Sequence, residues 1–498
     1  MSVFRSVARY LRVNWDWRLE QHLQQQERLR MMDPPPPKKH LPPPVGIGGY
    51  LRANAPVVPA PGLPLADVQG IIFRGYKYHQ HARHFCLRIS DIERTKAWIG
   101  SLVNRPGTPL QINTAKEWHG AMPDVLLNLG MTYEALEAFK IPGLDMQKSF
   151  VSFQDGAPKN AEIIGDTGES SPKNWIGDLG GGTHFVLSLY ALNDAILDRY
   201  SSELRAGFAE CLTEQYSHDA NALPDHKVHF GYRDSISQPH VRGVGKEITD
   251  DQPVVPPYYF IIMDHDLAPY NIPTPNNFWL NGTFGAFRIL KQDVHLFNDY
   301  LESQSHLVPP EKLKAQFCGR WDDGTPLHLS PGIGGCVPEA ELNRFNYSVP
   351  FEDSMGTKCP YGSHLRRTNA RMGTVLGGVQ AHRVMRRAIP FGPPDDDPSE
   401  ENRGLVGYFM GVDIQAQFEF IMQQWVNHAN FTSVIEQPSG FDPLIGMNDG
   451  TAASVFDVMD PYDGSSIRVK NIPRFVTTMG SAYCFLPSIT GLKYLAKV

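Results

Sequence analysis

The chain has 498 residues, of which 41% are hydrophobic, 20% charged and 11% aromatic, so a wholly disordered chain is excluded. At roughly 150 residues per domain, this length predicts several domains or one large duplicated unit. The 44 glycines and 41 prolines indicate many turns and argue against a helical bundle. The net charge of −7 argues against a broad cationic surface, so we expect no nucleic-acid partner.

Cysteine usage and hydropathy bear on the compartment. The six cysteines are scattered along the chain without a C-x-x-C pair, which indicates neither a zinc cluster nor a disulfide scaffold. No apolar run reaches the ~18 residues of a membrane span, and residues 1–20 lack the apolar run of a secretory signal. These features predict a cytoplasmic protein.

The first 32 residues differ in character from the rest. Apolar residues recur there at three- and four-residue spacing, which predicts an amphipathic helix over residues 1–32. This segment has six arginines and three acids, so it could dock on a membrane surface or a partner, or pack on its own protein. Seven prolines in the stretch 33–44 favour an extended backbone, and we interpret residues 33–59 as a linker.

After the linker, a strand followed by a helix occurs twice. Alternation over residues 84–89 is typical of a half-buried strand, and residues 90–93 resemble a capping box for a helix that continues through Leu102. Residues 284–289 repeat the strand pattern and residues 293–301 the helical one. The repeat favours two halves with the same order of elements.

The predicted halves are of α+β type and cover residues 60–250 and 251–498. A doubly wound nucleotide-binding sheet is the alternative, but neither G-x-G-x-x-G nor G-x-x-x-x-G-K-[ST] occurs. The glycines at 180–182 form either an ordinary turn or a phosphate-binding one. Further strands are predicted at 184–192 and 258–263, and further helices at 195–215 and 412–428.

Two histidine-containing segments could carry chemistry. His79, His81 and His84 lie close together, but they precede or enter a strand without an acidic neighbour, so we expect no metal ligation there. His364 has several arginines nearby, either as a solvated charge run or as an axial iron ligand whose arginines meet haem carboxylates. These arginines are Arg366, Arg367, Arg371, Arg386 and Arg387.

A third candidate is Asp234, in the polar turn of HFGYRDSISQPH, residues 229–240. Its local sequence favours a turn or capping aspartate over a catalytic carboxylate. Residue spacing alone does not decide between these two interpretations.

Seven separated segments are FGYRDSISQP, FGAFRILKQDV, CPYGSHLRRTNAR, VMRRAIPFG, QFEFIMQQWVN, FDPLIG and VTTMGSAYCFLPS. Together with LADVQGIIFRGYKYHQHARHF, they resemble the dye-decolourising peroxidase family in order and content, over about residues 60–498. The resemblance implies haem b enclosed by two ferredoxin-like α+β domains, with antiparallel sheets and peripheral helices. This fold agrees with the two halves predicted above.

The resemblance also implies roles for single residues. It makes His364 the proximal iron ligand and Asp442, in FDPLIG, the partner of the histidine ring N–H. It makes Asp234 the distal acid-base and Arg386 the distal arginine. Arg386 and Arg371 are further expected to contact the cofactor.

The activity implied is reduction of hydrogen peroxide with one-electron oxidation of bulky organic donors such as dyes and phenolics, through surface tyrosine or tryptophan residues. A haem-binding or haem-sensing protein with little turnover, or a haem-modifying enzyme, is the alternative. A homo-oligomer is also considered.

The chain departs from the family pattern at three positions. Ser235 replaces the glycine that follows the distal aspartate, and Ala370 replaces a proline in the histidine motif. Gly407 stands in a run where the family places larger side chains. Glycine after the distal aspartate is usual either because the backbone needs positive φ or because it must approach the porphyrin closely, and in the first case we expect a cost at Ser235. Gly407 predicts a roomier, wetter distal pocket.

Overall fold

A computed structural model describes the chain from residue 62 onward, with gaps. The predicted helix at 1–32 and linker at 33–59 lie outside the described residues, as do residues 246–253 around the predicted boundary. These three assignments therefore stay predictions. The described ranges are 62–105, 107–118, 120–141, 150–245, 254–263, 276–347, 353–371, 377, 379–394, 402–432 and 439–498.

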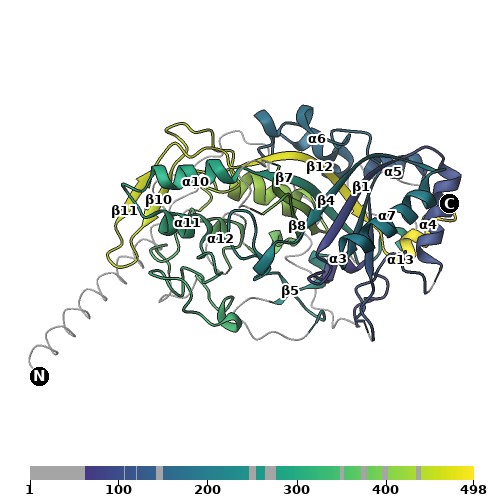
Figure 1. The fold of residues 1–498 in the computed structure, drawn as a ribbon, viewed down its shortest axis with the longest axis horizontal. Helices are drawn as coiled ribbons and strands as arrows, with labels where there is room; N and C mark the ends of the chain where they lie inside the picture. Colours follow the sequence, from purple (N-terminus) through teal and green to yellow (C-terminus); the bar gives the residue numbers. More distant parts are fainter. Residues whose placement is uncertain are drawn as a thin grey trace, which may run out of the picture. The chain divides into compact units, whose positions relative to one another are not determined.

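An eight-stranded sheet, with the order β4-β1-β3-β2-β12-β7-β9-β8, crosses the described part of the chain (Figure 1). Its neighbouring strands pair antiparallel throughout. Within each set of four the spatial order is fourth, first, third, second, which confirms the predicted duplicated ferredoxin-like α+β fold. The strands are β1 (His81–Ile89), β2 (Val125–Met131), β3 (Phe185–Ala191), β4 (Leu212–Asn221), β7 (Thr283–Gln292), β8 (Met385–Phe391), β9 (Gly404–Gly411) and β12 (Val476–Leu486).

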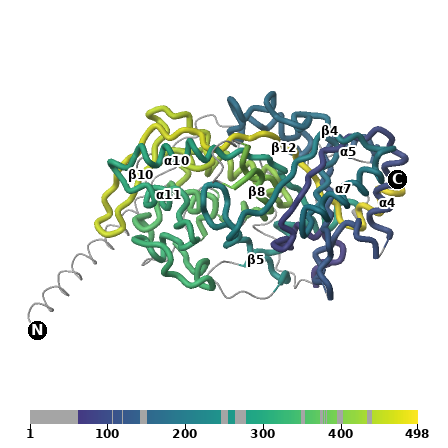
Figure 2. The backbone as a smooth tube through the Cα atoms, viewed as in Figure 1, coloured from purple at the N-terminus to yellow at the C-terminus, as the bar shows by residue number. Residues whose placement is uncertain are grey.

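The two halves of the sheet meet between β2 and β12. Figure 2 shows β12, drawn in yellow near the end of the chain, crossing the middle of the molecule. Strands β2 and β12 share one residue pair, Met131 with Phe485. The buried carboxamide of Gln69 bridges the rest of the seam: it donates to Leu129 O and Pro487 O, and accepts from Leu129 N, each at 2.9 Å. A side chain thus supplies hydrogen bonds that a strand neighbour would otherwise make.

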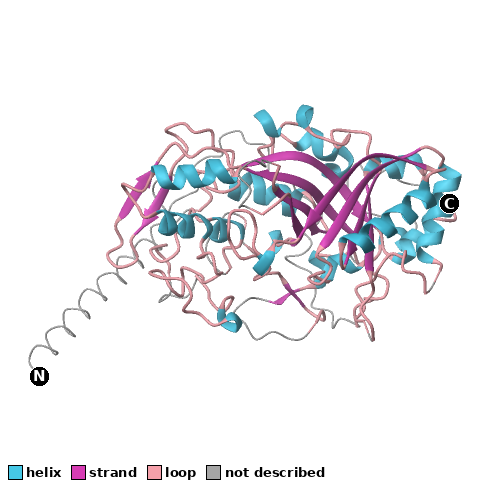
Figure 3. Ribbon diagram, in the orientation of Figure 1, coloured by secondary structure: helices cyan, strands magenta, loops and turns pink. Residues whose placement is uncertain are grey.

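A helical segment follows the first and third strands of each half along the chain. Figure 3 shows helices flanking the strands. In three of these segments an Asp or Asn side chain caps the helix by accepting from the backbone N–H three residues on, at 2.9–3.0 Å. The cap of the helix over residues 92–103 is Asp91, one residue later than Ser90, where the predicted capping box begins. The segments are α4 (Ile92–Val103), α7 (Asp194–Phe208), α10 (Val294–Ser303) and a π-helical stretch over 415–419 and 421–426.

Three sequence predictions are wrong in detail. The helix predicted at 195–215 ends at Phe208, because β4 begins at Leu212. Residues 258–263 do not form a strand, because Phe260 and Ile261 donate back to Pro257 O and close a tight turn. The helix predicted at 412–428 is wound mostly as a π-helix, a rare form that sequence periodicity does not distinguish.

Strand β1 is buried on both faces, and not on one as predicted. Phe85 and Leu87 pack under the helices, while Cys86, on the opposite face, belongs to a second apolar cluster that includes Ile71 and Ile72. The segment around α3 (Gly70–Phe73) supplies that second cover.

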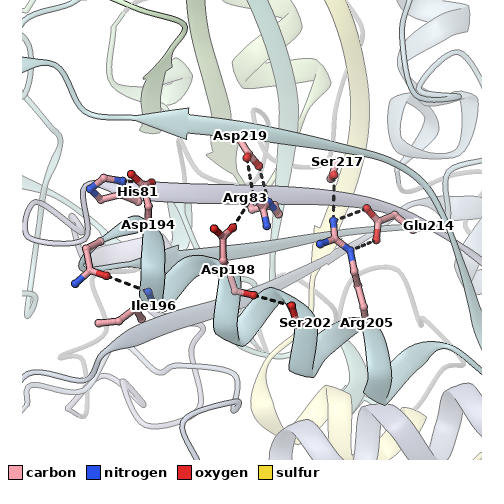
Figure 4. A network of polar contacts seen from close by, with 11 residues as sticks. His81, Arg83, Asp194, Ile196, Asp198, Ser202, Arg205, Glu214, Ser217 and Asp219 are labelled. Atoms are coloured by element: carbon pink, nitrogen blue, oxygen red, sulfur yellow. Dashed lines mark hydrogen bonds and ion pairs between the residues drawn. The ribbon is translucent and has the colours of Figure 1, made fainter.

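Ion pairs tie α7 to strands β1 and β4 at the surface (Figure 4). Arg83 Nε lies 2.6 Å from Asp219 Oδ1 and its Nη2 lies 3.2 Å from Asp198 of α7. Arg205 forms a two-pronged pair with Glu214 at 2.8 Å. Such exposed pairs contribute about 0–1 kcal/mol each, so they align the elements more than they stabilise them.

Shorter helices and strands complete the fold. Within the described residues, none of the helices is long and apolar enough to cross a bilayer. The remaining helices are α5 (Tyr133–Ala138), α6 (Val151–Asn160), α9 (Asn276–Trp279), α11 (Pro310–Cys318), α12 (His364–Thr368) and α13 (Ile489–Leu495). The remaining strands are β5 (His240–Val241), β6 (Val254–Val255), β10 (Phe456–Met459) and β11 (Ser466–Val469).

Candidate functional site

His364 is the first residue of α12, directly after the buried Ser363. Ser363 Oγ donates to Gln316 O of α11 at 2.6 Å, which holds the start of α12 in place. His364 Nδ1 lies 2.9 Å from Asp442 Oδ2, and the histidine side chain keeps 25% of its surface exposed. The predicted contact between these two side chains, 78 residues apart, is therefore present.

The Asp442 carboxylate is fully buried and well supplied with donors. Its Oδ1 accepts from the backbone N–H groups of Leu444 and Ile445, at 2.9 and 3.1 Å. Burial by itself would raise the pKa of Asp442, but His364, Arg367 and the Ile445 N–H together lower it below its ordinary value. An ionised carboxylate at Nδ1 leaves Nε2 as the metal-binding nitrogen of His364.

Asp234 and Arg386 belong to different halves of the fold. Asp234 lies exposed in the loop that follows β4, and Ser235 after it has φ of 64°. Arg386 lies in β8, and its Nη2 donates to Ser237 O at 2.5 Å. This bond places Arg386 beside the loop that carries Asp234, as a shared distal site requires.

The arginines near His364 are not a solvated charge run. Arg366, Arg367 and Arg371 are each at most 2% exposed. Arg366 pairs with Asp353 at 2.7 Å, whereas Arg367 donates to four backbone carbonyls and one hydroxyl. Arg387 donates to Ile71 O at 3.0 Å. Most of the hydrogen bonds of these buried guanidiniums therefore go to backbone carbonyls, and not to the anions that the sequence suggested.

Arg371, predicted to contact the cofactor, has structural contacts that the sequence did not indicate. Its guanidinium stacks 3.5 Å from the ring centroid of Phe345. It donates to Phe345 O at 2.9 Å and to the backbone and side-chain oxygens of Asn343 at 3.1 and 2.9 Å. These bonds fix the loop 343–345 against the end of the histidine motif, and a cofactor contact of Arg371 stays a prediction.

Arg320 is a residue that the sequence analysis missed. Its Nη1 donates to Gly324 O and Leu342 O at 2.8 and 2.7 Å, while its buried Nη2 has no hydrogen-bond partner within the described part of the chain. Burial lowers the pKa of this guanidinium, and the positive charge of Arg386 acts in the same direction. Local sequence offers no signal for it, because Arg320 follows the end of α11 as an ordinary basic residue.

The structure gives a backbone reason for glycine at 407. A Cβ atom there would lie 2.0 Å from Arg387 O and 2.5 Å from the Ala388 Cα of β8. Close approach of the two strands thus requires glycine at this position, and a roomier distal pocket stays a prediction. Ser235 has positive φ, the first of the two explanations considered for a glycine there.

These residues fit a haem. His364 offers Nε2 as an axial nitrogen, and its Nδ1 is held by an anion, as is usual for metal-bound histidines. The unpartnered Nη2 of Arg320 is a donor that a haem carboxylate would satisfy. Asp234 and Arg386 supply a carboxylate and a guanidinium from one neighbouring loop and strand.

Comparisons with known proteins agree with this site. No family model matches the chain. Peroxidase 2 of Mycetinis scorodonius is 28% identical over 461 residues, covering 87% of each chain. Dye-decolorizing peroxidase msp1 of the same organism is 29% identical over 480 residues, covering 88% of each.

Solved structures give the same result. A dye-decolorizing peroxidase in complex with 2,6-dimethoxyphenol is 27% identical and covers 87% of this chain and 100% of its own, with a TM-score of 0.74. A dye-decolorizing peroxidase described as engineered in its heme pocket has the same TM-score and coverage at 26% identity. Fold and site together define a haem-dependent enzyme of α+β architecture. Over most of its length the chain is similar, in sequence and in fold, to dye-decolourising peroxidases.

Proposed function

We propose that this protein is a peroxidase that reduces hydrogen peroxide and oxidises bulky donors such as dyes and phenols in one-electron steps. The contact between His364 and Asp442, on a fold shared with dye-decolourising peroxidases, is the observation that carries the proposal. One solved dye-decolorizing peroxidase is a complex with the phenolic molecule 2,6-dimethoxyphenol. We infer that the cofactor is haem b.

On the proximal side, His364 Nε2 would bind the iron. When bound, the haem would pass two electrons to peroxide and recover them from donors one at a time. Asp442 accepts the Nδ1 hydrogen bond, fixes the tautomer and ring orientation, and raises the basicity of the imidazole. Since Asp442 also accepts two backbone N–H bonds, its position does not depend on the histidine.

On the distal side, Asp234 would move a proton from the attacking oxygen of hydrogen peroxide to its leaving oxygen. One carboxylate can accept and donate that proton in turn, which is typically worth about 10²- to 10⁴-fold in rate. Arg386 places a fixed positive charge where negative charge develops on the leaving oxygen, typically worth about 10²- to 10³-fold. Its bond to Ser237 O keeps that charge beside the Asp234 loop.

One set of spectra tests the proposal. The purified protein should show a Soret band, change its spectrum with hydrogen peroxide, and regain the starting spectrum on addition of a phenolic donor. His364→Ala should lose or greatly weaken the Soret band. A Soret band without a peroxide response would indicate haem binding or sensing instead, and altered porphyrin products would indicate a haem-modifying enzyme.

Three further points are proposals of the same kind. A cytoplasmic location is supported by six free thiols, four of them buried, as is usual in a reducing compartment. Residues 1–32 would dock on a membrane or a partner. Because the proline run separates residues 1–44 from the part that resembles the family, removing them should leave haem binding intact and turnover within about threefold of wild type. A homo-oligomer is a further proposal, which a measurement of the molecular mass in solution would test.

A further inference from the structure

Gln238, four residues after Asp234, contacts the backbone of the distal arginine. Its Nε2 donates to Arg386 O at 3.0 Å, and its Oε1 accepts from Arg386 N at 3.2 Å. The carboxamide thus pairs with both backbone groups of one strand residue. A glutamine amide has the donor and the acceptor of a peptide unit, so it can stand in for a neighbouring strand.

The same arrangement occurs at two other places in the chain. Gln69 pairs with both backbone groups of Leu129 in β2, at 2.9 Å each. Gln316 pairs with both backbone groups of Met459 in β10, at 2.7 and 2.8 Å. Each glutamine therefore completes the hydrogen bonding of a strand residue.

Strand β8 is the last strand of the sheet, and loop side chains bond to its backbone. Gln238 bonds to Arg386 near the start of β8, and His229 Nε2 lies 2.7 Å from Phe391 O at its end. Arg386 returns a bond to the loop through Ser237 O. The segment 229–238, which contains Asp234, is therefore held along β8 at both ends.

We propose that Gln238 is a positioning residue that sets the distance between the guanidinium of Arg386 and the carboxylate of Asp234. This inference rests on the proposed peroxidase function. The two catalytic groups are separated by 152 positions along the chain and come from opposite halves of the fold. Gln238 holds the backbone of Arg386 while lying on the loop of Asp234, and it acts together with the bond from Arg386 Nη2 to Ser237 O of the same loop.

The consequence for catalysis follows from geometry. Proton transfer and charge stabilisation act on two oxygens of one small substrate, so the carboxylate and the guanidinium must keep their separation. A misplacement of about 1 Å can lower a rate by ~10²-fold. Loss of Gln238 should therefore slow the reaction with peroxide while leaving the proximal His364 site, and thus haem binding, intact.

The test uses the full chain loaded with haem. Gln238→Met keeps the length of the side chain and removes both hydrogen bonds. We expect its second-order rate with hydrogen peroxide to fall by ~10- to 100-fold, with an unchanged Soret band and an unchanged KM for the phenolic donor. Hydrogen–deuterium exchange of a peptide covering residues 384–391 should quicken, because the Arg386 N–H loses its acceptor.

Two further variants separate positioning from general destabilisation. Gln69→Met removes the same kind of bonds from Leu129 and should lower the melting temperature while keeping the wild-type peroxide rate. Gln238→Glu keeps an acceptor for Arg386 N but turns a second acceptor oxygen toward Arg386 O, so its rate should also fall below that of wild type.

The outcomes are distinguishable. A Gln238→Met protein with wild-type exchange in β8, or with quickened exchange but the wild-type peroxide rate, would overturn the positioning role. If the wild-type holoprotein does not react with peroxide, the proposed function fails, while the exchange measurement still decides whether Gln238 holds β8.

Discussion

Asp442→Asn is the sharpest test of the proximal arrangement, because it changes one atom of a fully buried side chain. The native carboxylate accepts from His364 Nδ1 at 2.9 Å and from two backbone N–H groups at 2.9 and 3.1 Å. In the variant, the carbonyl oxygen can keep both backbone bonds, which turns the amide N–H₂ toward His364. Nδ1 must then accept, so the ring proton moves to Nε2 and blocks the metal-binding nitrogen.

The magnitude follows from these contacts. Loss of a carboxylate behind a metal-binding histidine typically lowers metal affinity by about 10- to 100-fold. That factor corresponds to ~1.4–2.8 kcal/mol of binding free energy. Stability should fall by about 1–3 kcal/mol, because Arg367 loses a nearby anion and the amide gains an imperfect partner.

Two measurements check this prediction. Optical titration of the apoprotein with haem gives the affinity, and thermal unfolding of the same apoprotein gives the stability. Asp442→Ala serves as the control, since it also leaves the N–H groups of Leu444 and Ile445 without their acceptor and should be the less stable variant. Wild-type haem affinity in Asp442→Asn would refute the role of Asp442 as an anionic partner of His364.

Three further predictions concern other parts of the molecule. Asp234→Ala and Arg386→Ala should keep the Soret band but react with peroxide about 10²- to 10⁴-fold and 10²- to 10³-fold more slowly in stopped-flow mixing; wild-type rates in both would place distal catalysis elsewhere. Gly407→Ala should lower the melting temperature and the peroxide rate together, because its Cβ would lie 2.0 Å from Arg387 O; an unchanged protein would show that β8 and β9 can separate freely. Burial raises the pKa of Glu419 to about 7, so the folded state keeps a proton that the unfolded state releases near 4.5. The stability that this bound proton contributes is complete below the unfolded pKa and is lost as pH rises through 7. Denaturant unfolding should therefore show that, as the pH is raised above 7, the free energy of unfolding of wild type falls by roughly 3 kcal/mol relative to that of Glu419→Gln. Equal pH dependence of the two proteins would contradict the shift.

Much of the fold could be predicted from local sequence, because the features concerned depend on near neighbours. Alternation predicted β1, and polar residues before the apolar periods predicted the starts of α4 and α10, where Asp91 and Asp293 accept backbone N–H groups three residues on. The repeated strand-helix order indicated the duplication, which the strand order confirms. The segment around His364 was recognisable for the same reason, since its arginines follow within a few residues.

Tertiary structure decided the features that depend on distant segments. Periodicity cannot tell whether the second face of β1 is covered, because the cover comes from the segment around α3. Arginine clustering suggested solvent or anions, whereas backbone carbonyls brought in by folding satisfy Arg367 and Arg387. The need for glycine at 407 arises from the β8 backbone, which no local pattern reveals.

The candidate site shows the same division. The resemblance of several motifs, in their order, to one family was enough to single out His364, Asp234, Arg386 and Asp442, whereas the residues taken alone left an ordinary charge run and a turn aspartate as alternatives. The bond from Gln238 to Arg386 and the buried Nη2 of Arg320 came only from the structure. A hydrogen bond requires atoms within about 3 Å in a defined direction, and spacing along a chain carries no such information once the partners are many residues apart.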